Sequence, residues 1–209
     1  MAPGEAELVD SLRRGDEATF RIVVNKYHSG LVRVARGYVP SAAVAEEVVQ
    51  DTWLAVIKGL DSFEGRSSFK SWLFRILINK AQTRGAREAR SVPVDFSLGV
   101  DDYSTDLTHH SSGNRNVRFH WRTHPNAWSE LPEALFDEQE TRTKVEQSIE
   151  DLPAAQRLVI TMRGLEGLEP AEVCDLLGIS EANQRVLLHR ARTQVRAKLD
   201  SHFSTSVKA

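Results

Sequence analysis

The stretch 169–199, EPAEVCDLLGISEANQRVLLHRARTQVRAKL, decides the fold of the C-terminal part of the chain. A short apolar segment ends at Gly178, which can adopt the turn conformation that a side chain would resist. A second segment with apolar residues at helical spacing begins after Ser180, a good helix N-cap. Pro170 suits the first position of the first helix, where its missing N–H donor costs nothing. This arrangement predicts a helix-turn-helix.

The second helix of this motif is rich in positive charge, although the formal net charge of the whole protein is −2. Its outer face is expected to carry, at helical spacing, Gln184, Arg185, Leu188, His189 and Arg192. The major groove of DNA admits an α-helix, where Arg can read guanine and Gln can read adenine. The remaining arginines and Lys198 suit phosphates. Duplex DNA is the expected ligand, although a solvated helix face would give the same pattern.

Length and composition limit the class of protein. The 209 residues suit one domain or two small ones, and no apolar run is long enough to span a membrane. The N-terminus does not resemble a secretory signal. Cys174 is the single cysteine, which excludes an internal disulfide and fits a reducing compartment. We expect its side chain to be a small buried apolar group. We therefore expect a cytoplasmic protein without membrane insertion.

Charge is unevenly distributed along the chain. A second basic island lies in residues 66–90, with Glu88 as its one acidic residue, and comprises Arg66, Lys70, Arg75, Lys80, Arg84, Arg87 and Arg90. Residues 92–152 instead contain twelve Asp or Glu against five Lys or Arg. Clustered positive charge on a nearly neutral protein is typical of a polyanion binder.

Apolar periodicity predicts helices over most of the chain. In the N-terminal part these are 6–37, with a new start at Asp16, then 42–60 after Ser41, and 69–90. The expected core includes Val49, Trp53, Val56, Ile57, Leu60, Phe69 and Trp72. In the C-terminal part it comprises Leu152, Val159, Ile160, Leu165, Val173, Leu176, Leu177, Ile179, Val186, Leu187 and Val195.

Residues 91–134 lose this periodicity and are rich in Ser, Asp, His and Pro. We therefore predict an all-α fold of two small helical domains, 1–90 and 135–209, joined by a long, irregular, flexible linker that is acidic and aromatic.

Two blocks of the sequence resemble the extracytoplasmic-function group of bacterial sigma factors, in the sigma-70 family. They are VAEEVVQDTWLAVIKGLDSFEGRSSFKSWLFRILINKAQTRGARE and, further along, IEDLPAAQRLVITMRGLEGLEPAEVCDLLGISEANQRVLLHRARTQVRAKL. The resemblance covers roughly residues 18–90 and 140–200 and implies a region 2 bundle and a region 4 helix-turn-helix. It implies an alternative sigma factor that directs core RNA polymerase to promoters, with no cofactor and with an anti-sigma protein as a further partner.

The resemblance also implies roles for individual residues. Clamp helices of the largest polymerase subunit would contact Glu46, Glu47, Gln50, Asp51 and Leu54. The unpaired strand of the minus-ten element would contact Arg66, Ser67, Ser68, Lys70, Arg75, Asn79, Lys80 and Arg84. The resemblance and the outer face of the last helix together give the residues that would contact the duplex minus-35 element: Gln184, Arg185, Val186, His189, Arg190 and Arg192.

Other classes of protein have weaker support. His120 and His124 have the spacing of a zinc-binding pair in a helix, but Pro125 disfavours helix there, so no metal site is expected. The sequence shows no combination of residues typical of a catalytic site, so an enzyme is not expected either. A stand-alone regulator that binds DNA through the helix-turn-helix is the main alternative. It would have no need of the second basic island.

Overall fold

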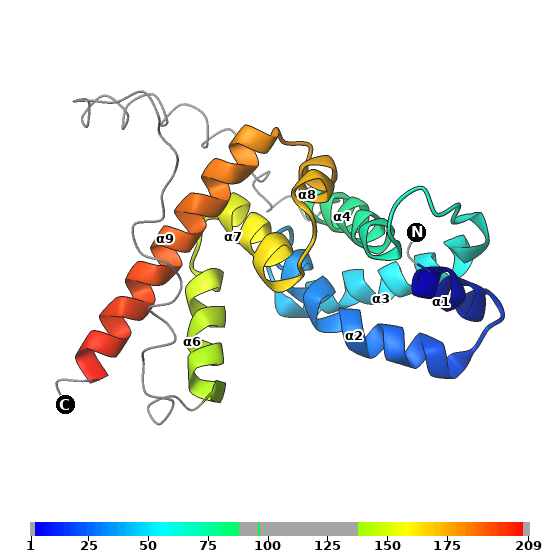
Figure 1. The fold of residues 1–209 in the computed structure, drawn as a ribbon, viewed down its shortest axis with the longest axis horizontal. Helices are drawn as coiled ribbons and strands as arrows, with labels where there is room; N and C mark the ends of the chain where they lie inside the picture. Colours follow the sequence, from blue (N-terminus) through cyan, green and yellow to red (C-terminus); the bar gives the residue numbers. More distant parts are fainter. Residues whose placement is uncertain (1–2, 88–95, 97–137, 207–209) are drawn as a thin grey trace.

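The computed structural model describes residues 3–87, residue 96 and residues 138–206. Every regular element in these ranges is helical, which confirms the predicted all-α fold for them. Helices α1 to α4 gather at one end of the molecule, and the long helix α9 runs to the opposite end (Figure 1). In the described ranges, no helix combines the length and the apolar character needed to cross a membrane.

The N-terminal half is a bundle of helices. These are α1 (Pro3–Arg13), α2 (Glu17–Ala35), α3 (Ala42–Gly59), the 3-10 turn η1 (Leu60–Ser62) and α4 (Phe69–Arg87). Helices α2, α3 and α4 pack against one another, each with an apolar face that repeats at three- and four-residue spacing. The buried core includes Val23, Leu31, Val34, Val49, Val56, Leu73, Phe74 and Leu77.

Polar side chains start two of these helices where the sequence predicts. The Asp16 carboxylate accepts a hydrogen bond from the Ala18 N–H at 3.1 Å, and the Ser41 hydroxyl accepts one from the Val44 N–H at 3.2 Å. Each N-cap satisfies a backbone donor that has no partner within the helix. The predicted break inside 6–37 and the predicted start at residue 42 are both confirmed.

The loop that precedes α4 rests on aromatic side chains. The Phe63 ring lies 4.9 Å from Trp72 and 6.2 Å from Phe69, between ring centroids. Phe69 is buried as predicted, whereas Trp72 is half-buried and packs against the core. Arg13 of α1 donates to the backbone carbonyls of Leu60, at 3.1 Å, and Phe63, at 2.5 Å. These contacts fix both sides of the loop.

The N-terminus of α4 is capped twice. The Ser68 hydroxyl accepts from the Ser71 N–H at 3.1 Å, and the Glu5 carboxylate of α1 accepts from the Phe69 N–H at 2.5 Å. Two donors at the positive end of the helix are thereby satisfied. The caps hold the start of α4 and the residues beside it in one orientation.

The C-terminal half contains α6 (Glu138–Glu150), α7 (Ala154–Ile160), the π-helical turn η5 (Thr161–Leu165), α8 (Pro170–Leu177) and α9 (Glu181–Ser206). Helix α9 packs against α6, α7 and α8. Gly178 has φ 66° and ψ 34°, the left-handed conformation that favours glycine, and the Ser180 hydroxyl accepts from the Asn183 N–H at 3.2 Å. These features confirm the predicted helix-turn-helix.

Two residues predicted as core are exposed instead. Ile57 is 53% exposed, because it lies one helical step from Val56 and just beyond the buried face of α3. Leu165 is 42% exposed and ends the π-helical turn, where the 3.6-residue period is not kept. Periodicity alone misplaces both side chains.

The two halves lie against each other in this conformation. Helix α4 contacts α8, as Figure 1 also shows, and α2 contacts η5. Leu158 packs so closely on the turn that follows α2 that a methyl group added to Gly37 would lie 2.5 Å from Leu158 Cδ2. Buried apolar residues of both halves form one cluster. The two predicted domains therefore contact each other in this conformation.

Most of the predicted linker, 91–134, lies outside the described residues. Phe96 is the exception: it is half-buried, packs against the core and accepts a hydrogen bond from Asn183 Nδ2 at 2.7 Å through its backbone carbonyl. The chain at residue 96 is thus attached to the start of α9.

Candidate nucleic-acid and polymerase interfaces

The loop 61–68 and helix α4 bring together the residues predicted to bind the minus-ten strand. Arg66 extends into solvent, with 84% of its side chain exposed, and pairs with Glu64 at 2.8 Å. Ser67 and Asn79 are also exposed, and Lys80 is half-buried. Arg84 pairs with Glu47 of α3 at 2.8 Å. An exposed cationic helix beside a loop is the kind of surface that binds single-stranded nucleic acid.

Three of the predicted strand-binding residues contact the C-terminal half. The Ser68 hydroxyl donates to Glu172 Oε1 at 2.9 Å, the Lys70 ammonium donates to the backbone carbonyl of Glu166, and Arg75 pairs with Asp175. Burial lowers the pKa of Lys70, because desolvation disfavours its charged form.

Glu172 is the acidic centre of this contact. Burial raises the pKa of its carboxyl, but hydrogen bonds from the Ser71 hydroxyl, the Glu169 N–H and the Ser68 hydroxyl, together with the Lys70 charge, outweigh that effect. The net pKa lies below the ordinary value, so the carboxylate is favoured.

The residues predicted to bind polymerase form one strip along α3. Glu47, Gln50, Asp51 and Leu54 are exposed, and Glu46, half-buried, pairs with His28 at 3.1 Å. Leu54 is 56% exposed, and Ile57 extends the strip by one turn. Large apolar side chains exposed beside polar ones are typical of protein-binding surfaces. The sequence prediction missed Ile57 as a surface residue because its apolar character favoured the core.

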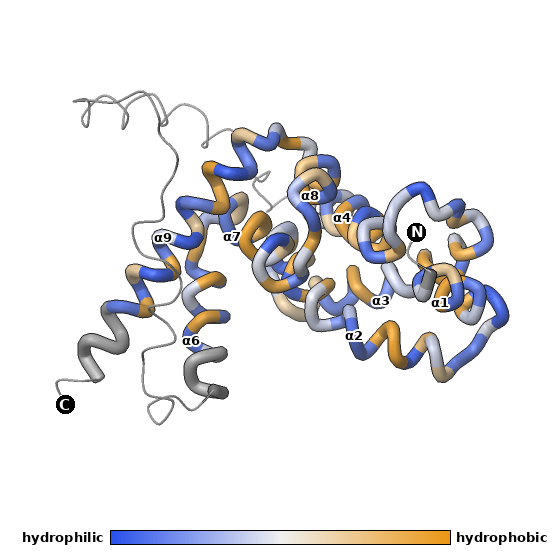
Figure 2. Tube along the Cα trace, in the orientation of Figure 1, coloured by the Kyte–Doolittle hydropathy of each residue, from blue (hydrophilic) through white to orange (hydrophobic). Residues whose placement is uncertain are grey.

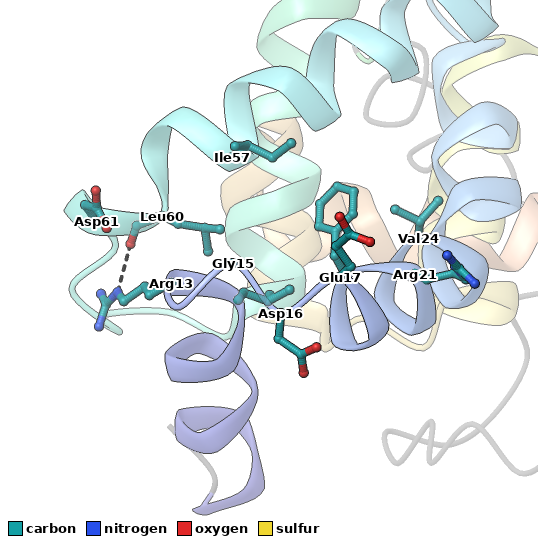
Figure 3. Close-up of a pocket in the computed structure, with 11 residues that line it drawn as sticks. Arg13, Gly15, Asp16, Glu17, Arg21, Val24, Ile57, Leu60 and Asp61 are labelled. Carbon is teal, nitrogen blue, oxygen red and sulfur yellow. Dashed lines mark hydrogen bonds between the residues drawn. The ribbon is translucent and has the colours of Figure 1, made fainter.

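A cleft of about 650 Å³ borders this strip, between α1, the start of α2 and the end of α3. Figure 3 shows Ile57 and Leu60 on one side of the cleft and Glu17, Arg21 and Val24 on the other. Its walls combine apolar and charged side chains. Sequence patterns gave no signal for it, because the cleft depends on how three helices pack.

The outer face of α9 carries the predicted minus-35 residues. Arg185, His189 and Arg192 are exposed at positions i, i+4 and i+7, and Val186 and Arg190 flank them half-buried. Arg185 has 73% of its side chain exposed and pairs with Glu181 at 3.3 Å. Along α9, hydrophilic and hydrophobic residues alternate, as expected for a helix with one packed and one free face (Figure 2).

Two residues expected on that outer face are buried. Gln184 is 2% exposed and Leu188 is 8% exposed. Gln184 directly precedes the exposed Arg185 in the sequence. Because its side chain is also polar, the sequence wrongly predicts that it is exposed. Its Nε2 atom is buried with no hydrogen-bond partner among the described residues. In this conformation Gln184 therefore belongs to the packed side of α9.

Other candidate sites have little support from the geometry. The half-buried Cys174 thiol has a pKa raised by burial, the opposite of an activated thiolate. Among the described residues, no three His, Cys, Asp or Glu side chains are placed to hold a metal ion. The histidines considered as a zinc pair, His120 and His124, lie outside the described residues.

Both halves of the chain are similar to known protein families. Residues 23–91 match the family model for sigma-70 region 2, and residues 142–195 match that for sigma-70 region 4. The chain is 31% identical over 194 residues to the ECF RNA polymerase sigma-E factor of Escherichia coli K12, covering 92% of each chain. It is 27% identical over 191 residues to the RNA polymerase sigma-H factor of Pseudomonas aeruginosa, covering 91% of each.

Solved structures share the fold. CnrH, in complex with the cytosolic domain of CnrY, matches with a TM-score of 0.54 and 21% identity, over 94% of this chain and 97% of that one. The sigma factor RpoE of Bartonella quintana, in complex with the anti-sigma factor NepR, matches with a TM-score of 0.54 and 22% identity, over 87% and 96%. With relatives of this identity and coverage, the chain belongs to the ECF family of RNA polymerase sigma factors.

Proposed function

We propose that this sigma factor binds core RNA polymerase through the α3 strip, the unpaired minus-ten strand through loop 61–68 and α4, and the minus-35 duplex through α9. As a member of its family, it is an alternative sigma factor that directs promoter-specific transcription initiation. The observation that carries the assignment of surfaces is that one chain presents two cationic helices, α4 and α9, on separate halves.

The polymerase surface is supported by the exposure of polar and apolar residues together. Glu47, Gln50 and Asp51 supply acidic and amide groups, while Leu54 and Ile57 supply apolar area that is left in water in the free chain. Covering those two side chains with a partner helix would remove this apolar area from water.

The minus-ten surface is supported by charge and by rigidity. Arg66, Asn79, Lys80 and Arg84 offer donors for phosphates and base edges along one helix and its preceding loop. The aromatic contacts beneath the loop and the caps at the start of α4 hold these groups in a fixed arrangement. A preorganised site loses less entropy when it binds.

The minus-35 surface is proposed to consist of Arg185, His189 and Arg192, with Val186 and Arg190 at its edges. Gln184 is left out, because its burial puts it out of reach of a groove. Arg185, with 73% of its side chain exposed, can make a bidentate contact with guanine.

Partners and location follow from the same family. We propose an anti-sigma protein as the regulator of this chain; NepR is described as the anti-sigma factor bound to the RpoE relative. We also propose that the chain works in the cytoplasm, where polymerase and promoter DNA are found, and that it is not an enzyme.

Transcription from a defined template tests the proposal. The purified chain, added to core polymerase and linear DNA with a candidate promoter, is expected to produce one run-off product that core polymerase alone does not. A stand-alone regulator, the alternative, would give no product with core polymerase and would act only when another sigma factor is present.

A further inference from the structure

Helix α1 contacts the loop 61–68 on both of its sides. The Arg13 guanidinium donates to the backbone carbonyl of Leu60, which directly precedes the loop, through Nε at 3.1 Å. It also donates to the carbonyl of Phe63, inside the loop, through Nη2 at 2.5 Å. The Glu5 carboxylate accepts from the N–H of Phe69, which directly follows the loop, at 2.5 Å. Figure 3 shows the Arg13 side chain reaching Leu60, and one helix thus holds the backbone on both sides of the loop.

Helix α1 is itself attached to the bundle by apolar contacts. Val9 and Leu12 are 2% and 6% exposed, and α1 packs against α2 and η1. The burial of these two side chains keeps α1 in place when a polar residue on its surface is replaced. The whole of α1 precedes residues 23–91, the part of the chain that matches the sigma-70 region 2 family. The hold on the loop therefore comes from outside the matched segment.

The loop residues proposed to bind the minus-ten strand need such a hold. Arg66 has 84% of its side chain exposed, and Ser67 is exposed beside it. The backbone turns just before them at Gly65, where φ is 69°. A short exposed segment of this kind loses conformational entropy when it binds. Contacts that restrict the backbone in advance reduce this loss, as in any preorganised site.

We propose that Arg13 and Glu5 are positioning residues for the minus-ten strand: they do not contact DNA, and they fix the backbone of the loop that does. The proposal rests on the function proposed above. Breaking either contact should weaken binding of the unpaired strand. Binding of core polymerase through the α3 strip and of duplex DNA through α9 should not change.

The opposite charges of the two residues separate positioning from simple electrostatics. DNA is a polyanion, so the loss of a nearby carboxylate should strengthen binding if charge alone mattered. Positioning predicts instead that Glu5→Ala weakens strand binding, as Arg13→Ala does. Glu5→Gln should restore the wild-type affinity, because the side-chain carbonyl of glutamine can still accept from the Phe69 N–H.

Two other substitutions in and beside α1 are matched controls. Arg14→Ala removes a neighbouring charge whose side chain donates to Ser11 Oγ at 2.9 Å, and Glu7→Ala removes an exposed carboxylate. Holoenzyme is assembled from core polymerase and the full chain, and fluorescence anisotropy measures its affinity for a labelled single-stranded minus-ten oligonucleotide. Arg13→Ala and Glu5→Ala should bind about three- to tenfold more weakly than their controls.

Salt dependence tests whether Arg13 acts without contacting DNA. The slope of log affinity against log salt should be the same in Arg13→Ala and the wild type, because a residue that contacts no phosphate releases no counterion. Affinity for core polymerase, measured on the same variants, should equal that of the wild type. This second measurement shows that the bundle is folded.

The results separate the positioning role from the proposed function. If the wild type directs run-off transcription, but Arg13→Ala binds the oligonucleotide as well as Arg14→Ala, the positioning role is overturned and the function stands. A salt slope smaller by about 1 in Arg13→Ala would make Arg13 a phosphate contact instead. Tighter strand binding by Glu5→Ala, or equal losses of strand and polymerase binding, would also overturn the role. If the wild type gives no promoter-specific product with core polymerase, the proposed function itself fails.

Discussion

Arg84 of α4 and Glu47 of α3 form an ion pair, 2.8 Å from Nη2 to Oε2, that joins the proposed DNA surface to the proposed polymerase surface. Both side chains are substantially exposed, at 41% and 57%. An exposed ion pair of this kind contributes little to the free energy of folding. Both side chains can therefore leave the pair and bind DNA or polymerase instead. The proposed DNA surface on α4 and the proposed polymerase surface on α3 therefore lie next to each other on adjacent helices.

Arg84→Ala should separate DNA binding from stability. The free energy of unfolding should fall by less than about 1 kcal/mol, because the ion pair is exposed. If Arg84 contacts a phosphate, the slope of log affinity against log salt, measured on the single-stranded oligonucleotide, should shrink by about 1. An unchanged slope together with a large loss of stability would make Arg84 a structural residue.

Leu54→Asp should weaken binding to core polymerase by at least about tenfold, since it places a charge in an apolar contact. Urea unfolding should change little, because Leu54 is 56% exposed in the free chain. The matched control is Ile22→Asp: Ile22 is an apolar residue of α2, 64% exposed and outside the proposed strip. Equal losses for the two variants would argue against a specific surface on α3.

Arg185→Ala should cost about 1–3 kcal/mol of binding on promoters with one particular base pair and little on others, if Arg185 reads that base. The measurement is holoenzyme binding to a set of promoters that differ at single minus-35 positions. A uniform loss on every promoter would instead identify a phosphate contact.

Gln184→Met should leave that base preference unchanged, because residue 184 is buried. The free energy of unfolding should stay the same or rise by about 1 kcal/mol, since the change removes a buried donor without a described partner and keeps the apolar volume. Altered promoter preference in Gln184→Met would show that α9 rotates or loosens on DNA.

Acidification should loosen the contact between α8 and the start of α4 through Glu172, which accepts hydrogen bonds from the Ser68 and Ser71 hydroxyls. The pKa of Glu172 in this contact is lower than the ordinary value of 4.5, so its contribution is fully present above that value and is lost as the pH falls through the lowered pKa. Small-angle scattering should record expansion of the chain in this range, and in Glu172→Gln the expansion should depend less steeply on pH. An identical pH profile in Glu172→Gln would show that the titration of Glu172 does not control this expansion.

Local signals in the sequence predicted most of the fold. Ser41 and Gly178 act within a few residues of themselves, through an N-cap and a left-handed turn, so their effects can be read from sequence order alone. The contact of Glu166 with Arg33 joins residues 133 apart, and no local pattern reports it. Gln184 is a third case: it is buried although its neighbour Arg185 is exposed, and the sequence pattern does not distinguish these two adjacent positions of the helix.

The central claim is that this chain leads core polymerase to promoters defined by two elements, one for each cationic surface. Mapping the 5′ ends of transcripts made on genomic DNA by core polymerase plus the purified chain tests it most directly. We expect start sites that share a minus-ten and a minus-35 element at constant spacing. Lys80→Ala should weaken use of the minus-ten element, and Arg185→Ala should weaken use of the minus-35 element. Start sites that match those of core polymerase alone, or that share a single element, would contradict it.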